Sequence, residues 1–230
     1  MKKILSLLLC LLLCVLCLPA LGESDTAATT QVSVSITDDT GALVLALETV
    51  LVTDTDGDAV LTINDALACA HAAHPDGAEA YSAVPTEWGL SLMKLWGVEN
   101  GGSYGYYLND ASAWSLLDPV KEGDHVKAYA FTDLNAFSDT YCYFDTAFVE
   151  TSVGETVELT LTAAAFDENF APITVPVAGA ALVIDGEKTD IVTDEAGCVS
   201  LTVVEAGSYL STARSAEMVL VPPVCVIKVQ

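Results

Sequence analysis

Short stretches of alternating apolar and polar residues run through most of this chain, and one segment has helical spacing. Alternation with a period of two is typical of strands that bury one face, so this pattern constrains the fold most strongly. The helical segment is the Ala-rich stretch Asn64–His74, where Leu67 and His71 continue a helical spacing that starts at Ile63. We therefore expect strands throughout the chain and one short helix in its first half.

The first half predicts an α+β domain. Strand-like segments at Gln31–Ile36 and Leu43–Val52 precede the helix, and three more follow it at Leu90–Val98, Tyr104–Leu108 and His125–Phe131. A pair of antiparallel strands, a helix packed across the sheet and later strands form a roll of the β-grasp kind. We place this domain at residues 31–138.

From about Tyr141 the pattern contains strands alone. They are separated by turns that contain Gly, and lie at Ala147–Val149, Thr156–Leu161, Ala181–Ile184, Cys198–Val204, Tyr209–Ala213 and Val224–Val229. Short strands at this spacing indicate a β-sandwich of immunoglobulin type over residues 141–230. The predicted fold class is an α+β β-grasp-like domain followed by an all-β immunoglobulin-like sandwich.

Residues 1–22 have the pattern of a secretory signal peptide. Two lysines precede an apolar run over Ile4–Leu18, and Ala20 and Gly22 fit the small-x-small cleavage rule. The run is shorter than the ~20 residues that a membrane-spanning helix needs. We expect a secreted or surface-associated extracellular protein without a transmembrane anchor, with residues 23–30 as a polar linker.

The charge balance excludes some classes of partner. The chain has 230 residues, with 8 Lys and Arg against 32 Asp and Glu, and its formal net charge is −24. Nucleic-acid affinity depends mainly on Lys and Arg that neutralise phosphates, and anionic membranes attract basic segments. We therefore expect no nucleic acid as partner, and an unidentified extracellular protein, glycan or small molecule instead.

Four cysteines follow the predicted signal, and their pairing is open. They are Cys69, Cys142, Cys198 and Cys225. Export permits disulfides, and four cysteines allow three pairings.

The segment Asp54–Asp65 has the spacing of a calcium loop. Its carboxylates stand at loop positions 1, 3, 5 and 12, the Val60 carbonyl would serve position 7 and Thr62 position 9; the predicted metal residues are Asp54, Asp56, Asp58, Val60, Thr62 and Asp65. Ca²⁺ takes six to eight hard oxygen ligands, so this spacing predicts Ca²⁺ as a cofactor. The alternative is an acidic, solvated turn that caps the helix.

This loop resembles the calcium loops of dockerins, which also place Asp at position 12. Ala59 stands at position 6, where the EF-hand loop uses Gly for a sharp turn. We expect Ala59 to have strained backbone, at a cost of roughly 1 kcal/mol, which lowers calcium affinity.

Aromatic residues cluster between residues 81 and 114, where all three tryptophans lie. Such side chains can stack on a sugar or another flat ligand, or form the core of the domain. The candidate ligand-binding residues are Tyr104, Tyr107, Asn109 and Trp114.

Two further patterns point weakly to catalysis or metal binding. Gly101–Gly105 matches G-x-S-x-G, but a hydrolase elbow needs a strand before it and a helix after it, and here an acidic turn and a strand flank it. His71 and His74 stand at i, i+3, which could begin a zinc site, although no H-E-x-x-H pattern exists. With no nucleophile–base pair placed, we expect no enzyme.

The run Gly105–Asp110, followed by Pro119–Val126, resembles the "G-x-Y-hydrophobic-N-G … V-K-x-G-D-x-V" pattern of transcobalamin-like β-grasp domains, over about residues 31–133. Asp110 stands where Gly is usual. These domains close over a corrinoid in the vitamin B12 carriers and recur in secreted bacterial proteins. The resemblance implies the fold and a secreted setting rather than corrinoid binding, because the helical domain that holds the corrinoid is missing.

The segments Val177–Ala180, Thr193–Val199 and Ala206–Tyr209 resemble the "V-x-G-A … T-D-x-x-G-x-V … A-G-x-Y" run of bacterial immunoglobulin-like domains. Such modules usually space or present another domain. The predicted function is a non-catalytic, secreted or cell-surface bacterial binding protein, with a calcium-stabilised β-grasp domain and a presenting immunoglobulin-like module. The alternative is an extracellular binder of a small molecule, corrinoid-like or glycan.

Overall fold

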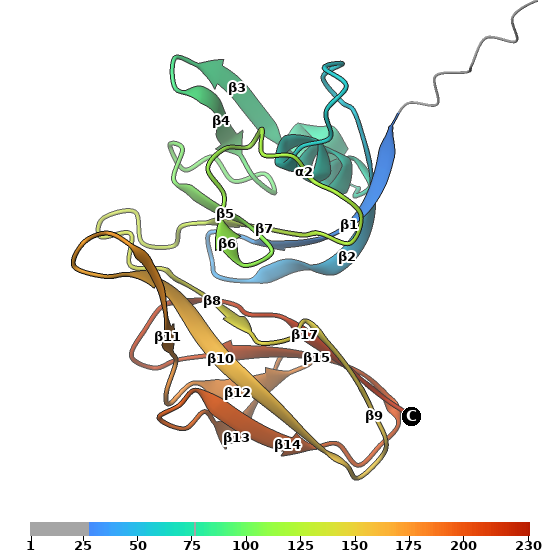
Figure 1. The fold of residues 1–230 in the computed structure, drawn as a ribbon, viewed down its shortest axis with the longest axis vertical. Helices are drawn as coiled ribbons and strands as arrows, with labels where there is room; N and C mark the ends of the chain where they lie inside the picture. The colour runs from blue at the N-terminus through green and yellow to red at the C-terminus, as the bar shows by residue number, and fades with distance from the viewer. Residues whose placement is uncertain (1–27, 76) are drawn as a thin grey trace, which may run out of the picture.

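The computed structural model describes residues 28–75 and 77–230, which form two halves joined in sequence at about residue 135 (Figure 1). The predicted signal peptide, residues 1–22, lies outside the described residues, as does most of the predicted linker. Within the described ranges, no helix is both long enough and apolar enough to cross a membrane.

The N-terminal half is a five-stranded sheet with one short α-helix and a separate hairpin. Its elements are β1 (Thr29–Thr37), β2 (Leu43–Thr53), α2 (Ile63–Ala72), the 3₁₀ turn η1 (Gly77–Ala80), β3 (Ser82–Thr86), β4 (Gly89–Lys94), β5 (Tyr104–Leu108), β6 (Ala111–Ser112) and β7 (His125–Ala130). The sheet order is β2-β1-β7-β5-β6, with β1 and β7 parallel, and β3 pairs with β4 alone. β1 therefore lies between β2, its antiparallel partner, and β7, the last strand of this half.

Local sequence explains where α2 begins and ends. Thr62 caps its N-terminus and forms a reciprocal capping box with Asp65. The helix buries Ile63, Leu67 and Ala70 against β1 and β2, and Pro75 follows its end. A ten-residue helix can cover only part of a five-stranded sheet.

The C-terminal half is a sandwich of two sheets. Its strands are β8 (Thr140–Phe144), β9 (Phe148–Thr151), β10 (Thr156–Phe166), β11 (Pro172–Pro176), β12 (Ala181–Ile184), β13 (Glu187–Val192), β14 (Cys198–Thr202), β15 (Gly207–Arg214), β16 (Leu220–Val221) and β17 (Cys225–Val229). One sheet has the order β11-β10-β8-β16, with β14 also paired to β10, and the other has the order β13-β12-β15-β17-β9. Side chains of both sheets share one apolar core, which includes Leu159, Leu161, Leu182 and Ile227.

The predicted α+β class is wrong, because the described chain is almost entirely β. Strands β1 to β17 fill both halves, and α2 is the single α-helix of the described residues. The segment Ser82–Thr86, which precedes the predicted strand Leu90–Val98, pairs with β4 to form the hairpin β3–β4. The all-β character of the C-terminal half agrees with its immunoglobulin-like resemblance at the level of an all-β fold.

The four cysteines of the described chain are free thiols. Cys142 and Cys225 belong to the core of the sandwich, and burial raises the pKa of each thiol to about 12. Both therefore stay protonated at neutral pH and pack as small apolar side chains.

Candidate functional site

The acidic loop, residues 54–65, brings three of its carboxylates together. One oxygen of each of Asp54, Asp56 and Asp58 lies within 4.8 Å of the others. The backbone N–H groups of Ala59 and Gly57 donate to Asp54 and lower its pKa, whereas partial desolvation raises the pKa of Asp56. Like charges this close repel each other unless a cation lies between them.

Asp65 does not join the cluster of Asp54, Asp56 and Asp58. It is fully buried, and its Oδ2 accepts from the backbone N–H and the hydroxyl of Thr62, at 2.9 and 2.7 Å. Its Oδ1 accepts from the backbone N–H of Thr55 at 2.8 Å and from the Thr55 hydroxyl. Asp65 and Thr62 thus fasten the loop to the start of α2, outside the cluster of three carboxylates.

The backbone of the loop has the strain expected at position 6. Ala59 has φ +68°, and Gly57 has φ +83°. Val60 is 45% exposed, and its N–H donates to Asp58 at 2.7 Å. Three carboxylates with hard oxygens fit Ca²⁺, although a full ligand set would need further carbonyls or water.

A groove lies between the two halves, with a volume of about 740 Å³. Small-molecule sites commonly have volumes of about 300–1,000 Å³, so this groove is of ligand size. One wall comes from Tyr107 and the β6 segment with Trp114, and the other from the β10–β11 hairpin. Of the predicted ligand residues, Tyr107 and Trp114 therefore meet here, whereas Tyr104 and Asn109 lie elsewhere.

The β10–β11 hairpin supplies apolar groups that the sequence analysis missed. It reaches past the body of the sandwich toward the N-terminal half (Figure 1). Phe170 at its turn is 86% exposed, and Phe166 and Ile173 are also exposed and line the groove. The sequence contains a signal for these groups. Phe166 and Phe170 flank the polar segment Asp167–Asn169 and do not belong to an alternating apolar pattern.

Stacked tyrosines join the two halves beside the groove. The rings of Tyr107 on β5 and Tyr141 on β8 are nearly parallel, with centroids 3.4 Å apart and an interplanar angle of 4°. Tyr129 and Phe131 extend the same cluster. Tyr107 is therefore held in place by the C-terminal half.

An ion pair between a buried lysine and a half-buried aspartate lies at the same junction. Lys127 is 8% exposed and forms an ion pair with Asp110, and its Nζ lies 5.5 Å from the centre of the Tyr141 ring. The Tyr141 hydroxyl donates to Asp110 at 2.7 Å. Burial raises the pKa of Tyr141, so this hydroxyl keeps its proton. These contacts hold the groove walls at a set spacing.

The other two predicted ligand residues have structural roles. The Tyr104 hydroxyl lies 2.8 Å from the carbonyl oxygens of Met93 and Val98. The Asn109 side chain accepts from the His125 backbone N–H and donates to Asp124, each at 2.9 Å. Asn109 has φ +51° in the two-residue β5–β6 turn, a conformation that Asn tolerates well.

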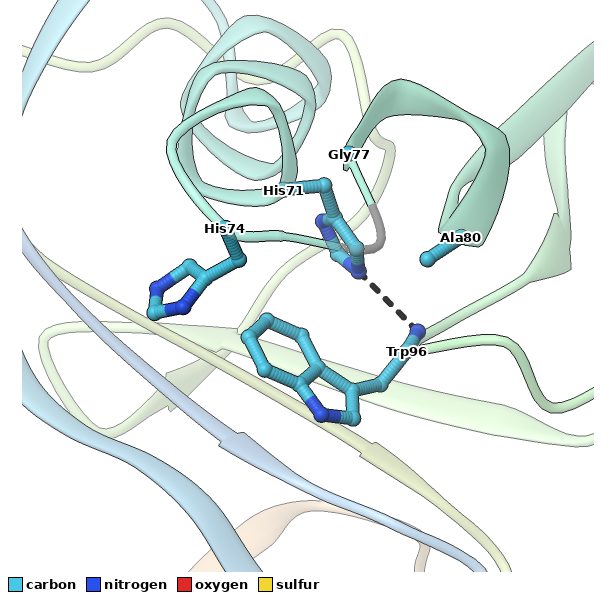
Figure 2. Close-up of a pocket in the computed structure, with 5 residues that line it drawn as sticks. All are labelled: His71, His74, Gly77, Ala80 and Trp96. Carbon is cyan, nitrogen blue, oxygen red and sulfur yellow. Dashed lines mark hydrogen bonds between the residues drawn. The ribbon is translucent and has the colours of Figure 1, made fainter.

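The histidines of the suspected zinc pair are engaged with protein groups (Figure 2). Nδ1 of His71 donates to the Leu67 carbonyl at 2.6 Å, and its Nε2 accepts from the Trp96 backbone N–H at 3.0 Å. Burial lowers the His71 pKa, so the ring is neutral and both nitrogens are used. His74 packs edge-on against Trp96, and its Nε2 lies 3.3 Å from Glu48, unaligned for a hydrogen bond. The cavity between them has about 10 Å³, roughly the space of one water.

A serine–histidine pair exists, but it is built into the sheet. Ser35 Oγ lies 2.9 Å from His125 Nε2 and accepts from the Leu47 backbone N–H at 3.0 Å. Ser35 is 4% exposed, and desolvation lowers the His125 pKa to about 4. The pair links β1, β2 and β7 and holds the kink at Leu47, where φ is +50°.

The G-x-S-x-G run is likewise structural. Ser103 lies in the loop before β5, where its N–H donates to the Asn100 side chain at 3.0 Å. A Cβ on Gly105 would lie 2.2 Å from the ring of Tyr129, so this glycine makes room for the tyrosine cluster.

Comparisons with known proteins identify no family. No family profile and no curated protein sequence match the chain. Solved structures of Dscam1, each described as its N-terminal four Ig domains, are distant matches. Isoform 6.9 has 10% identity and a TM-score of 0.26, and the match covers 65% of this chain and 36% of the Dscam1 chain. Isoform 7.44 has 11% identity and a TM-score of 0.25, and the match covers 88% of this chain and 46% of the Dscam1 chain. The chain thus spans less than half of either structure, and similarity at this level carries no argument about fold or function.

Proposed function

We propose that this protein is a non-catalytic, extracellular binding protein whose ligand site is the groove between its two halves. The observation that carries this proposal is the convergence of exposed aromatic side chains, Trp114, Phe166 and Phe170, on a cavity of ligand size. Exposed aromatic groups around one hollow are typical of binding sites rather than of ordinary surface. The extracellular setting rests on the predicted signal peptide.

The junction supports this proposal because it preorganises the site. The Tyr107–Tyr141 stack and the hydrogen bond from the Tyr141 hydroxyl to Asp110 hold both walls before any ligand arrives. Binding then costs little ordering of the protein, which favours affinity. The position of the Ser35–His125 pair also supports a role without catalysis, because this pair links strands of the sheet.

The test is a ligand screen with a matched tryptophan control. Aromatic fragments and neutral pyranosides would be screened against the intact protein by saturation-transfer NMR. Replacing Trp114 and Phe170 by Ala should weaken hits about tenfold or more, as expected for loss of aromatic anchors. Trp88→Ala removes another exposed tryptophan, 89% exposed on the β3–β4 hairpin, and should leave binding intact. Hits that survive the double variant would overturn the groove assignment.

We also propose that Ca²⁺ binds at Asp54, Asp56 and Asp58 and stabilises the N-terminal half. The proximity of three carboxylate oxygens supports this assignment. Asp65 and Thr62 would serve by fixing the loop to α2, since their polar atoms bond each other. The bound ion would supply charge neutralisation and structural order.

A further inference from the structure

The ligand class of the groove follows from the charges around it. The residues that line the groove include one acid, Asp110, and no Lys, Arg or His among the described residues. Asp110 is already paired with Lys127 and bonded to Tyr141. The sign of the potential in the groove therefore depends on the acids at its rim.

Three acids stand at that rim, on both walls. Asp118 accepts the backbone N–H of Trp114 at 2.8 Å. Asp167 and Glu168 belong to the hairpin turn between Phe166 and Phe170, and the N–H groups of Ala171 and Asn169 lower the pKa of Asp167. The rim is thus negative at neutral pH, within a chain of net charge −24.

The walls offer aromatic faces to a positive charge. Trp114 is 95% exposed, Phe170 86% and Phe166 65%. An aromatic face carries partial negative charge and attracts a cation within about 6 Å of the ring centre. Aromatic faces and rim acids thus favour the same sign of ligand and disfavour anions.

Backbone recognition of an extended peptide is poorly supported at this groove. β6 and β11 are the outer strands of their sheets in the described structure. However, β6 has two residues, and β11 begins and ends with Pro172 and Pro176, which have no N–H to donate. A strand added at either edge would gain few hydrogen bonds, so side-chain recognition of a small ligand is favoured.

We infer that the groove selects a small organic cation with a flat or apolar body, which stacks on Trp114, Phe166 and Phe170 while the acids at the rim attract its charge. This inference rests on the proposed function and assigns the substrate class of the same site. It gives the charges of Asp167 and Glu168 a role in ligand selectivity, in addition to the hydrogen bonds by which Asp167 shapes the hairpin turn.

The test uses three probes with one apolar body, measured by calorimetry on the intact protein at pH 7. They are 4-phenylbutylammonium, 4-phenylbutanol and 4-phenylbutyrate. The ammonium probe should bind about tenfold more tightly than the alcohol, and the carboxylate should bind most weakly. The Asp167→Asn, Glu168→Gln double variant should reduce the preference for the ammonium probe several-fold and leave the affinity for the alcohol unchanged. The control is the Asp190→Asn, Glu187→Gln double variant on the distant strand β13, which should keep the ammonium preference.

The outcomes separate this inference from the proposed function. Equal affinity for the ammonium and alcohol probes, both lost on Trp114→Ala with Phe170→Ala, would overturn charge selection and retain the groove as a binding site. Tighter binding of the carboxylate probe than of the ammonium probe would also overturn charge selection and retain the groove as a binding site. If none of the probes binds, selection of apolar cations is overturned, and the fragment and pyranoside screen decides the proposed function separately.

Discussion

The acidic loop and the groove are built at different scales. In the loop, the hydrogen bonds that its carboxylates accept join residues at most 10 positions apart, as between Thr55 and Asp65. In the groove, Asp110 and Tyr141, 31 positions apart, fasten walls that belong to separate halves. Spacing along the chain can therefore predict a local cluster of carboxylates, whereas a site between the two halves depends on the packing of remote strands.

The largest expected effect comes from removing the stack at the junction. Tyr141 is 3% exposed, and Tyr141→Ala would lose its packing and its bond to Asp110. We expect a loss of about 3–5 kcal/mol in the free energy of unfolding, measured by urea denaturation. Groove ligands should bind weakly to the variant, while any calcium response of the loop should persist. Tyr141→Phe keeps the stack and should lose only about 1 kcal/mol; an equal loss in both variants would contradict the role of the stack.

Acid should weaken the N-terminal half through His125. Desolvation lowers its folded pKa to about 4 from an ordinary value of 6.5, so the unfolded chain takes up the proton first. Stability is therefore full above pH 6.5 and is lost as the pH falls from 6.5 toward 4, by about 3 kcal/mol in total. Urea midpoints across this range would measure the loss.

The control for this prediction is His125→Gln, which cannot titrate. Its slope of stability against pH should be smaller than that of the wild type between pH 6.5 and 4. His71 has a lowered pKa for the same reason, and its remaining contribution has the same sign. Identical slopes in the two proteins would contradict the assignment to His125.

Calcium should stabilise the N-terminal half through the acidic loop. At a hundredfold excess over Kd, a bound ion would add about 2.7 kcal/mol to the free energy of unfolding. A thermal melt with Ca²⁺ and then with chelator would measure this increase, which Asp58→Asn should largely remove. Asp190→Asn removes an acid outside the loop and should keep it. A melt that calcium leaves unmoved would refute the metal site, and the groove proposal would be unaffected.

The smallest expected effect concerns strain at Ala59, where φ is +68°. Ala59→Gly should relieve about 1 kcal/mol of left-handed strain, partly offset by the greater freedom of Gly in the unfolded chain. The urea midpoint should rise slightly or stay level, and calcium affinity should increase. Ligand binding in the groove should not change. A weaker calcium affinity in this variant would contradict the strain argument.

Much of the secondary structure could be predicted from local pattern. The segments Tyr104–Leu108 and Ala181–Ile184 form strands with the predicted bounds, and the predicted helix Asn64–His74 corresponds to α2. These segments have clear periodicity and turn residues at their ends, so local preference and tertiary packing agree. Two of the four ligand residues that the sequence predicts, Tyr107 and Trp114, line the groove.

Other parts could not be predicted because tertiary pairing overrides local signals. Pro85 argues against a strand, yet Ser82–Thr86 pairs with β4 as an isolated hairpin, in which proline is tolerated. Pro172 and Pro176 likewise argue against a strand, yet Pro172–Pro176 forms the outer strand β11. Tyr104 looked like a ligand residue beside a loop, but its hydroxyl closes that loop instead.

The sequence alone determined the acidic loop, the helix start at Thr62 and the alternating strands, because each depends on neighbours within a few residues and on a fixed period. Tertiary structure decided that the fold is nearly all β, that Asp65 turns away from the other carboxylates, and that two remote aromatic segments enclose one groove. The physical reason is that burial and stacking act between surfaces that meet only after the chain has folded. The Tyr107–Tyr141 contact, which positions the groove, has no local signature in the chain.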